Sequence, residues 1–314
     1  MLSVTTGVRS QLCDIKYFQN NFHHLGFNGF PKLNILPDNS LILTSVYNFT
    51  ATGLIKMNSS GDTLWSKTYI NPGSSSGKGF AKTLNDWDGN LFSVMNTRYL
   101  TTLDTAGNVL STHYLNGLDN NGYTDAAVFP NGDKLVFYAV HNGVGTGGVL
   151  LRVDKSMNSV KWSRMIGDDY FWYSNILIDG NTILIAGSVG IPPAGGKNLE
   201  SFIIKLNGDD GTTMTSNAFL DAGSSSKVVL LYKSGNGYII DGSTYLTDDP
   251  NSMNATYYIR LTAGLNIQAS KQFIETPNLN SGAYRLLPQN DGSFYGAYGE
   301  FFNLTLFNIN SSMP

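Results

Sequence analysis

One short segment of the chain places acidic and aromatic side chains next to one another. Residues 168–173 read Asp-Asp-Tyr-Phe-Trp-Tyr, two acids followed by four aromatic residues. Aromatic rings stack on the apolar face of a pyranose ring, while carboxylates accept hydrogen bonds from its hydroxyl groups. The candidate ligand-binding residues of this segment are Asp168, Asp169, Tyr170, Trp172 and Tyr173.

Two further candidates, Tyr123 and Asp248, lie in turn-rich regions elsewhere in the chain, residues 119–125 and 247–252. The alternative interpretation is that the aromatic side chains pack between neighbouring structural repeats. They would then contribute to the core rather than to a binding surface.

The sequence lacks the standard motifs of nucleophilic, metal-dependent and phosphate chemistry. It has no Gly-x-Ser-x-Gly, no His-Glu-x-x-His and no Gly-Lys-Ser/Thr phosphate loop. A glycoside hydrolase or lyase would need two carboxylates that converge over a central channel. Its acids would come from Asp119, Asp125, Asp168, Asp169, Asp248, Asp249 and Glu275. A non-enzymatic binding or structural protein is favoured, and a carbohydrate-active enzyme is the alternative.

The pattern predicts neither a metal site nor a cofactor. Residues 86–90, Asp-Trp-Asp-Gly-Asn, resemble half of a calcium loop but lack its third early ligand and its distant glutamate, so we interpret them as a hairpin turn. Asp209 and Asp210 have the same interpretation, and His23 and His24 are expected in an ordinary loop. A single cysteine, Cys13, excludes an intrachain disulfide and a cysteine-based metal cluster.

The composition of the chain excludes some classes of binding partner. The 314 residues carry a formal net charge of −3 and only 14% charged residues, so no basic field suits nucleic acid. No apolar stretch is long enough to cross a bilayer, so we expect no membrane insertion. The first residues lack the positively charged and apolar regions of a secretory signal. The expected location is a virion or an extracellular surface, with the cytoplasm as the alternative.

A recurring pattern organises the chain around these candidates. An apolar strand, a tight Asp/Asn/Gly turn and a second strand recur at residues 55–65, 103–110, 153–162, 206–212 and 261–266. The period is about 50 residues, which is the spacing of four-stranded propeller blades. A second type of turn occurs six times, near residues 38–40, 86–90, 131–133, 179–181, 234–237 and 290–292.

We therefore predict an all-β fold, a six-bladed β-propeller of four-stranded antiparallel blades in a single domain of residues 1–314. The predicted blades span about 30–70, 80–115, 124–166, 174–219, 227–273 and 283–310. The last blade lacks a fourth strand in its own segment. Residues 11–18 align with 63–70, so an N-terminal strand at about 8–18 is expected to complete it and to cover its edge.

In such a fold the two kinds of short hairpin lie on one face, and the longer connections lie on the other. The longer connections are expected at residues 141–148, 190–198 and 247–252 within blades, and at 119–125, 167–174 and 275–282 between blades. Variable loops on a rigid scaffold are the usual place for binding residues. The candidate residues all belong to this long-loop face.

The recurring hairpin resembles the blade repeats of quinoprotein-like bacterial propellers, in which an acid, a glycine and a following Trp mark the hairpin. The Trp is present at Trp65 and Trp162, while Ser111, Thr215 and Gln268 or Ala269 occupy the equivalent places. This resemblance implies the blade architecture and no quinone binding.

The composition, low in charge and rich in Asn, Gly, Ser and Thr, is similar to that of propeller subunits of phage tails and bacterial surface adhesins. That resemblance implies a cell-surface glycan or a neighbouring virion or surface protein as partner. It also implies a homo-oligomer within an assembly.

Overall fold

The computed structural model of the chain describes a series of strands joined by tight hairpins. It describes residues 32–47, 51–59, 62–70, 82–95, 99–115, 124–141, 146–166, 170–190, 199–219, 224–246, 255–274, 285–288, 294–300 and 303–309. Contacts group the chain into two compact units, Met1–Asn120 and Asn121–Pro314. The organisation into a single domain stays a prediction.

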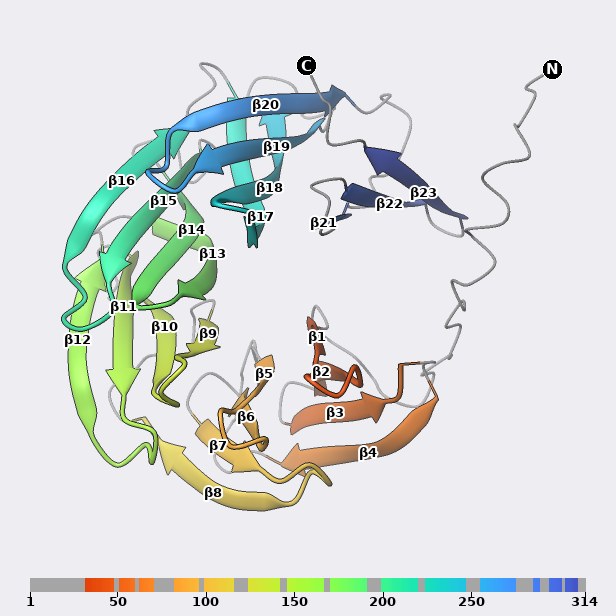
Figure 1. The fold of residues 1–314 in the computed structure, drawn as a ribbon, viewed down its shortest axis with the longest axis vertical. Coiled ribbons are helices and arrows are strands. Elements are labelled where there is room, and N and C mark those ends of the chain that lie inside the picture. Colours follow the sequence, from red (N-terminus) through yellow and green to blue (C-terminus); the bar gives the residue numbers. More distant parts are fainter. Residues whose placement is uncertain are drawn as a thin grey trace. The chain divides into compact units, whose positions relative to one another are not determined.

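The described residues form only β-sheets. Five sheets have four antiparallel strands and one has three, and in each sheet the strands follow one another in chain order (Figure 1). Consecutive strands that pair directly need only short connections, which is why tight turns recur at a fixed spacing. No helix in this part of the chain has the length and apolarity needed to cross a membrane.

The first unit contains two sheets. Sheet β1–β4 consists of Lys32–Ile35, Leu41–Tyr47, Ala51–Met57 and Thr63–Ile70, and sheet β5–β8 of Lys82–Asn85, Leu91–Met95, Tyr99–Leu103 and Val109–Tyr114. One hydrophobic cluster joins the two sheets, with Leu36, Ile42 and Leu54 from one and Leu91, Met95 and Leu103 from the other. Burial of these aliphatic side chains is the main force holding the two sheets together.

The second unit contains the other four sheets. Sheet β9–β12 consists of Thr124–Val128, Lys134–His141, Thr146–Val153 and Val160–Ile166, and sheet β13–β16 of Tyr170–Asp179, Thr182–Gly190, Leu199–Asn207 and Thr213–Phe219. Sheet β17–β20 consists of Ser224–Ser234, Gly237–Leu246, Ala255–Thr262 and Ile267–Ile274. The three-stranded sheet β21–β23 consists of Arg285–Pro288, Phe294–Glu300 and Asn303–Ile309.

Sheet β13–β16 is buried on both faces. One cluster, including Phe137, Leu150, Ile183 and Ile185, joins it to sheet β9–β12. A second cluster, including Leu184, Ile203, Ile240 and Leu261, joins it to sheet β17–β20. Odd and even residues of β14 therefore pack into different cores, which explains why its residues 183–186 are all apolar.

A β-bulge recurs at the same place in all five four-stranded sheets. The register between the third and fourth strand shifts at Lys56/Met57, Thr102/Leu103, Arg152/Val153, Lys205/Leu206 and Arg260/Leu261. Just before the bulge, Lys56 pairs with Trp65, Arg152 pairs with Trp162, and Arg260 pairs with Ala269. The Trp equivalent in sheet β17–β20 is thus Ala269 rather than Gln268.

The structure confirms the all-β class and four-stranded antiparallel sheets. Two boundaries differ: β13 begins at Tyr170 and β17 at Ser224, earlier than the predicted blade starts near 174 and 227. At the last of the repeated hairpins the left-handed backbone conformation falls on Leu265, with φ of 66°, not on Gly264. The Leu265 side chain is 1% exposed, so its burial offsets the cost of that conformation. The predicted closing strand at about 8–18 lies outside the described residues.

Candidate functional site

The two ends of each four-stranded sheet differ in their connections. In sheet β13–β16, strand β13 turns into β14 at Asp179–Thr182, and β15 turns into β16 between Asn207 and Thr213. Both turns lie at one end of the sheet because the strands are antiparallel. We call this the hairpin end. The longer connection from β14 to β15, residues 191–198, leaves from the opposite end, which we call the loop end.

Three of the candidate residues lie at this loop end. Tyr170, Trp172 and Tyr173 belong to the first residues of β13, because Tyr170 pairs with Gly190, the last residue of β14. The predicted connection 167–174 is therefore shorter than expected, and the aromatic run is part of a strand. The structure describes the backbone of these three residues. The remaining candidates, Asp168, Asp169, Tyr123 and Asp248, lie outside the described residues.

The aromatic run contains an irregularity in the strand. Phe171 pairs with Val189 and Tyr173 pairs with Ser188, so Trp172 is the extra residue of a β-bulge. A bulge bends the strand locally and redirects the side chains on either side of it. Such bulges are common next to binding and active sites, and here the irregularity coincides with the central candidate residue.

A buried carboxylate of the neighbouring sheet accepts a hydrogen bond from strand β13, three residues after the aromatic run. Asp125 of β9 is 4% exposed, and its Oδ2 accepts a hydrogen bond of 2.6 Å from the backbone N–H of Ile176. Asp125 is one of the acids from which an enzyme would draw its catalytic pair. Its burial and its bond to the neighbouring strand identify a structural role instead.

A row of buried hydroxyl groups continues from the aromatic run across the sheet. Tyr173 pairs with Ser188, and Ser188 pairs with Ser201. The Oγ of Ser188 accepts a 2.9 Å hydrogen bond from the N–H of Val228 in β17. The Oγ of Ser201 lies 2.9 Å from the hydroxyl of Tyr257 in β19. Two polar contacts thus join sheets β13–β16 and β17–β20 in the same row as Tyr173.

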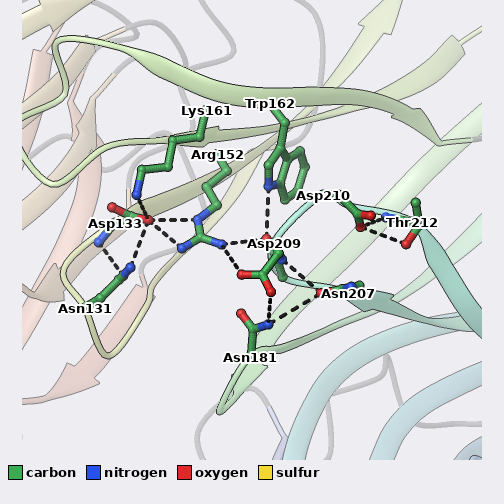
Figure 2. Close-up of polar contacts among 11 residues, drawn as sticks. Asn131, Asp133, Arg152, Lys161, Trp162, Asn181, Asn207, Asp209, Asp210 and Thr212 are labelled. Carbon is green, nitrogen blue, oxygen red and sulfur yellow. Dashed lines mark hydrogen bonds and ion pairs between the residues drawn. The ribbon is translucent and has the colours of Figure 1, made fainter.

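The hairpin end carries a separate polar cluster (Figure 2). The carboxylate of Asp133, in the β9–β10 turn, accepts hydrogen bonds from Arg152 Nε at 2.9 Å and Lys161 Nζ at 2.7 Å. The Nδ2 of Asn131 donates to the same oxygen at 3.1 Å. Arg152 and Asp133 are both buried. Burial by itself would raise the pKa of Asp133, but the hydrogen bonds from Lys161 and Arg152 outweigh it and hold that pKa below its usual value.

The same arginine links two sheets. Its Nη1 donates a 2.6 Å hydrogen bond to the carbonyl oxygen of Gly208, which also accepts a 2.9 Å bond from the indole Nε1 of Trp162. Gly208 lies in the β15–β16 turn, and its N–H donates to the carbonyl of Asn181 at 2.7 Å. The backbone of Gly208 therefore connects the ends of β11 and β12 with both turns of the next sheet.

Related contacts recur between other neighbouring sheets. In the first unit, Trp65 Nε1 donates to the carbonyl of Thr105 at 3.1 Å, and the hydroxyl of Tyr69 donates to the carbonyl of Gly107 at 2.7 Å. Between β16 and the β19–β20 turn, Asn217 Nδ2 donates to the carbonyl of Leu265 at 3.1 Å. In each case a side chain of a fourth strand binds the turn between the third and fourth strands of the next sheet. This repetition identifies the hairpin-end contacts as part of the fold rather than as a binding site.

The glycines in these turns are required by close approach. A Cβ atom at Gly107 would lie 2.9 Å from the Trp65 ring, and one at Gly211 would lie 2.9 Å from the Trp162 ring. Both glycines also have φ above +70°. The Gly and Trp of the repeated sequence pattern thus reflect a packing contact: the Trp of one sheet lies against the turn glycine of the next sheet.

One exposed residue at the hairpin end was not among the sequence candidates. Trp87 is 62% exposed in the β5–β6 turn, where Asp86 N donates to the Asn90 carbonyl at 2.7 Å. The equivalent positions of two other turns are Pro37 and Pro130, residues that favour a turn. A Trp does not favour a turn in this way. Its occurrence at this turn position could therefore have identified Trp87 as an exposed residue from the sequence alone.

The turn interpretation of residues 86–90 and of Asp209 and Asp210 is confirmed, since these residues lie in the β5–β6 and β15–β16 hairpins. Among the residues that the structure describes, no group of three or more His, Cys, Asp or Glu side chains could hold a metal ion. The prediction for His23 and His24 lies outside those residues.

Comparisons with known proteins bear on the fold. No protein-family model matches the chain, and no curated protein matches it. Among solved structures, BBS1N, crystallised in complex with ARL6DN, is similar with a TM-score of 0.50 and 9% identity, covering 88% of this chain and 77% of that one. A protein of unknown function from Bacteroides caccae has a TM-score of 0.49 and 11% identity, over 87% and 90% of the two chains. BamB from Moraxella catarrhalis has a TM-score of 0.42 and 11% identity, over 86% and 83%.

At these identities the likeness concerns the fold alone. The repeated four-stranded antiparallel sheets and the likeness to BBS1N show a fold of the propeller type. Neither observation assigns a ligand or a reaction.

Proposed function

We propose that this chain is a non-enzymatic binding protein that recognises a cell-surface glycan through the loop end of sheet β13–β16. Tyr170, Trp172 and Tyr173 are the leading contacts. The observation that carries the proposal is the placement of this aromatic run in a bulged strand end at the loop end of the sheet. A strand end supported by a sheet presents aromatic side chains with less conformational freedom than a loop does, which lowers the cost of binding.

Charge suggests the kind of glycan. Asp168 and Asp169 directly precede the aromatic run, and Asp248 belongs to another connection assigned to the same end. Neighbouring carboxylates disfavour an anionic sugar, so neutral hexose oligosaccharides are the expected ligands. A neighbouring virion or surface protein is the other partner that the same aromatic surface would suit.

The position of Asp125 favours binding over catalysis. A glycosidase needs two carboxyl groups that reach the sugar. Asp125 is 4% exposed and its carboxylate accepts the N–H of Ile176, so it does not serve as one of them. The acids that would remain for an enzyme are Asp119, Asp168, Asp169, Asp248, Asp249 and Glu275.

The finer architecture belongs to the same proposal. We propose a six-bladed propeller whose three-stranded sheet β21–β23 is completed by residues 11–18. The registers support this: Phe294 pairs with Ile309 as Leu41 pairs with Met57, and the other sheets add a fourth strand beside the third. A virion or extracellular surface, in a homo-oligomeric assembly, is the setting that suits a glycan-binding propeller of this composition.

A glycan-array screen of the purified protein tests the function. Wild type should bind neutral oligosaccharides, Trp172→Ala should lose that binding, and Trp87→Ala should keep it, because Trp87 lies at a hairpin end. Mass spectrometry of the same incubations should detect no released sugar. Release of sugar would instead establish the enzyme, and an absence of any glycan binding would reject glycan recognition.

A further inference from the structure

Strand β13 is held on one side by the buried carboxylate of Asp125. Because β13 is the first strand of its sheet, part of its backbone N–H groups point away from β14. The N–H of Ile176 is bonded by Asp125 Oδ2 at 2.6 Å, three residues after Tyr173. Asp125 therefore fixes the position of β13 along its length relative to sheet β9–β12.

On the other side, Ser188 fixes the strand that pairs with the aromatic run. Ser188 is fully buried, and it is the register partner of Tyr173. Its hydroxyl accepts the N–H of Val228 at 2.9 Å, where β17 has a register shift of its own. The backbone opposite Tyr173 is thereby tied to sheet β17–β20.

We propose that Asp125 and Ser188 are positioning residues for ligand binding at residues 170–173, although both are buried and neither belongs to the aromatic run. This inference rests on the proposed function. A bulge weakens the ladder locally, so the backbone around Trp172 depends on contacts beyond its own sheet. Loss of either contact would let the run adopt several positions, and the ligand would then have to order it on binding.

Ser201 provides a matched control. It is buried like Ser188, it is the next residue in the same row, and its hydroxyl also contacts sheet β17–β20, at Tyr257. It lies in β15, however, and does not pair with β13. Ser201→Ala removes a buried contact between the same two sheets and leaves the bond between Ser188 and Val228 in place.

The experiment combines hydrogen exchange with affinity. Peptides covering 170–176 are followed in wild type, Asp125→Leu, Asp125→Asn, Ser188→Ala and Ser201→Ala, and affinities are measured for maltohexaose, cellohexaose and mannohexaose. Asp125→Leu and Ser188→Ala should speed exchange in 170–176 and weaken binding about tenfold. Asp125→Asn keeps an acceptor oxygen and should restore both values, and Ser201→Ala should change neither.

Unchanged exchange in 170–176 for Ser188→Ala, or an equal change in Ser201→Ala, would overturn the inference. Faster exchange with unchanged affinity would overturn it as well, since positioning would not matter to binding. If wild type binds none of the three sugars, the proposed function is rejected. The inference that Asp125 and Ser188 position the site for these ligands is then rejected too. The exchange data would then report only on the support of β13. If Asp125→Leu does not fold, the comparison of Ser188→Ala with Ser201→Ala decides alone.

Discussion

The indole N–H of Trp162 donates a hydrogen bond of 2.9 Å to the carbonyl of Gly208, a residue of the next sheet along the chain. Arg152 donates to the same oxygen at 2.6 Å. In the first unit, Trp65 makes the corresponding contact with Thr105. The Trp of the repeated hairpin is thus an element of packing between sheets, and a Trp outside this pattern needs another explanation.

Two Trp variants separate these roles. Trp162→Ala should lower the free energy of unfolding by about 3 kcal/mol, since it removes a large packed ring and leaves Gly208 with fewer donors. Trp87→Ala should change it by less than about 0.5 kcal/mol, because Trp87 is 62% exposed. Urea denaturation followed by circular dichroism measures both. A similar loss in the two variants would argue against the packing role.

Gly208 itself should not tolerate a side chain. A Cβ atom there would lie 2.5 Å from Oδ1 and 2.6 Å from the carbonyl oxygen of Asn181. Gly208→Ala should therefore destabilise the protein by about 2 kcal/mol, which is the range of overpacking. At Gly264 the nearest atom would be 3.6 Å away, so Gly264→Ala should be neutral or slightly stabilising. Thermal unfolding of the two variants compares them, and equal melting temperatures would contradict the close approach at Gly208.

The Asp133 cluster predicts a loss of stability in acid. The folded-state pKa of Asp133 lies below its ordinary value of 3.8. The stability that the charged form contributes is therefore fully present well above pH 3.8, and it is lost as pH falls through the lower folded-state pKa.

Asp133→Asn tests this dependence. At pH 7 it should cost about 3 kcal/mol, because the buried Arg152 loses its closest carboxylate and is left with the exposed Asp209, 3.9 Å away, as ionic partner. Below pH 4 the difference between variant and wild type should shrink. Denaturation at a series of pH values measures it, and a constant difference across pH 2–7 would show that the carboxylate charge is not responsible.

The proposed closing strand makes a covalent prediction. If residues 11–18 pair with β23 as β4 pairs with β3, Cys13 lies opposite Asn308, as Trp65 lies opposite Lys56. Directly opposed residues of antiparallel strands are within disulfide range. Because Cys13 is the single native cysteine, Asn308→Cys should form an intrachain disulfide on oxidation.

The control for that experiment is Thr305→Cys. Its side chain would lie on the other face of the strand and three residues away from Asn308, so no bond to Cys13 should form. Non-reducing electrophoresis and mass spectrometry read out both variants. A disulfide in neither variant, or in both, would rule out the proposed register.

The repeated pattern of turn and strand was enough to predict the four-stranded sheets and the two kinds of hairpin. Local signals of this sort, a turn glycine followed by a strand, depend on neighbouring residues only. They also located Ser111 and Thr215 as equivalents of Trp65 and Trp162, but left Gln268 and Ala269 as alternatives, and the register at the bulge identifies Ala269.

What the sequence did not reveal depends on contacts between distant residues. Asp125 is buried where it accepts a hydrogen bond from Ile176, fifty-one residues later in the chain. No pattern in the residues around Asp125 predicts this burial. The sequence predicts a later start for β13, near residue 174, because two acids precede the aromatic run and suggest a loop. The aromatic residues, which have high β-propensity, instead pair with the end of β14.

The proposal that the loop end of sheet β13–β16 binds a neutral glycan is tested most directly by calorimetric titration. Wild type, Trp172→Ala and Trp87→Ala are each titrated with maltohexaose, cellohexaose and mannohexaose. The expected result is equal affinity of wild type and Trp87→Ala for at least one sugar, and an affinity at least about thirtyfold weaker in Trp172→Ala, as for a central contact residue. Undiminished binding by Trp172→Ala, or loss of binding in Trp87→Ala instead, would contradict it.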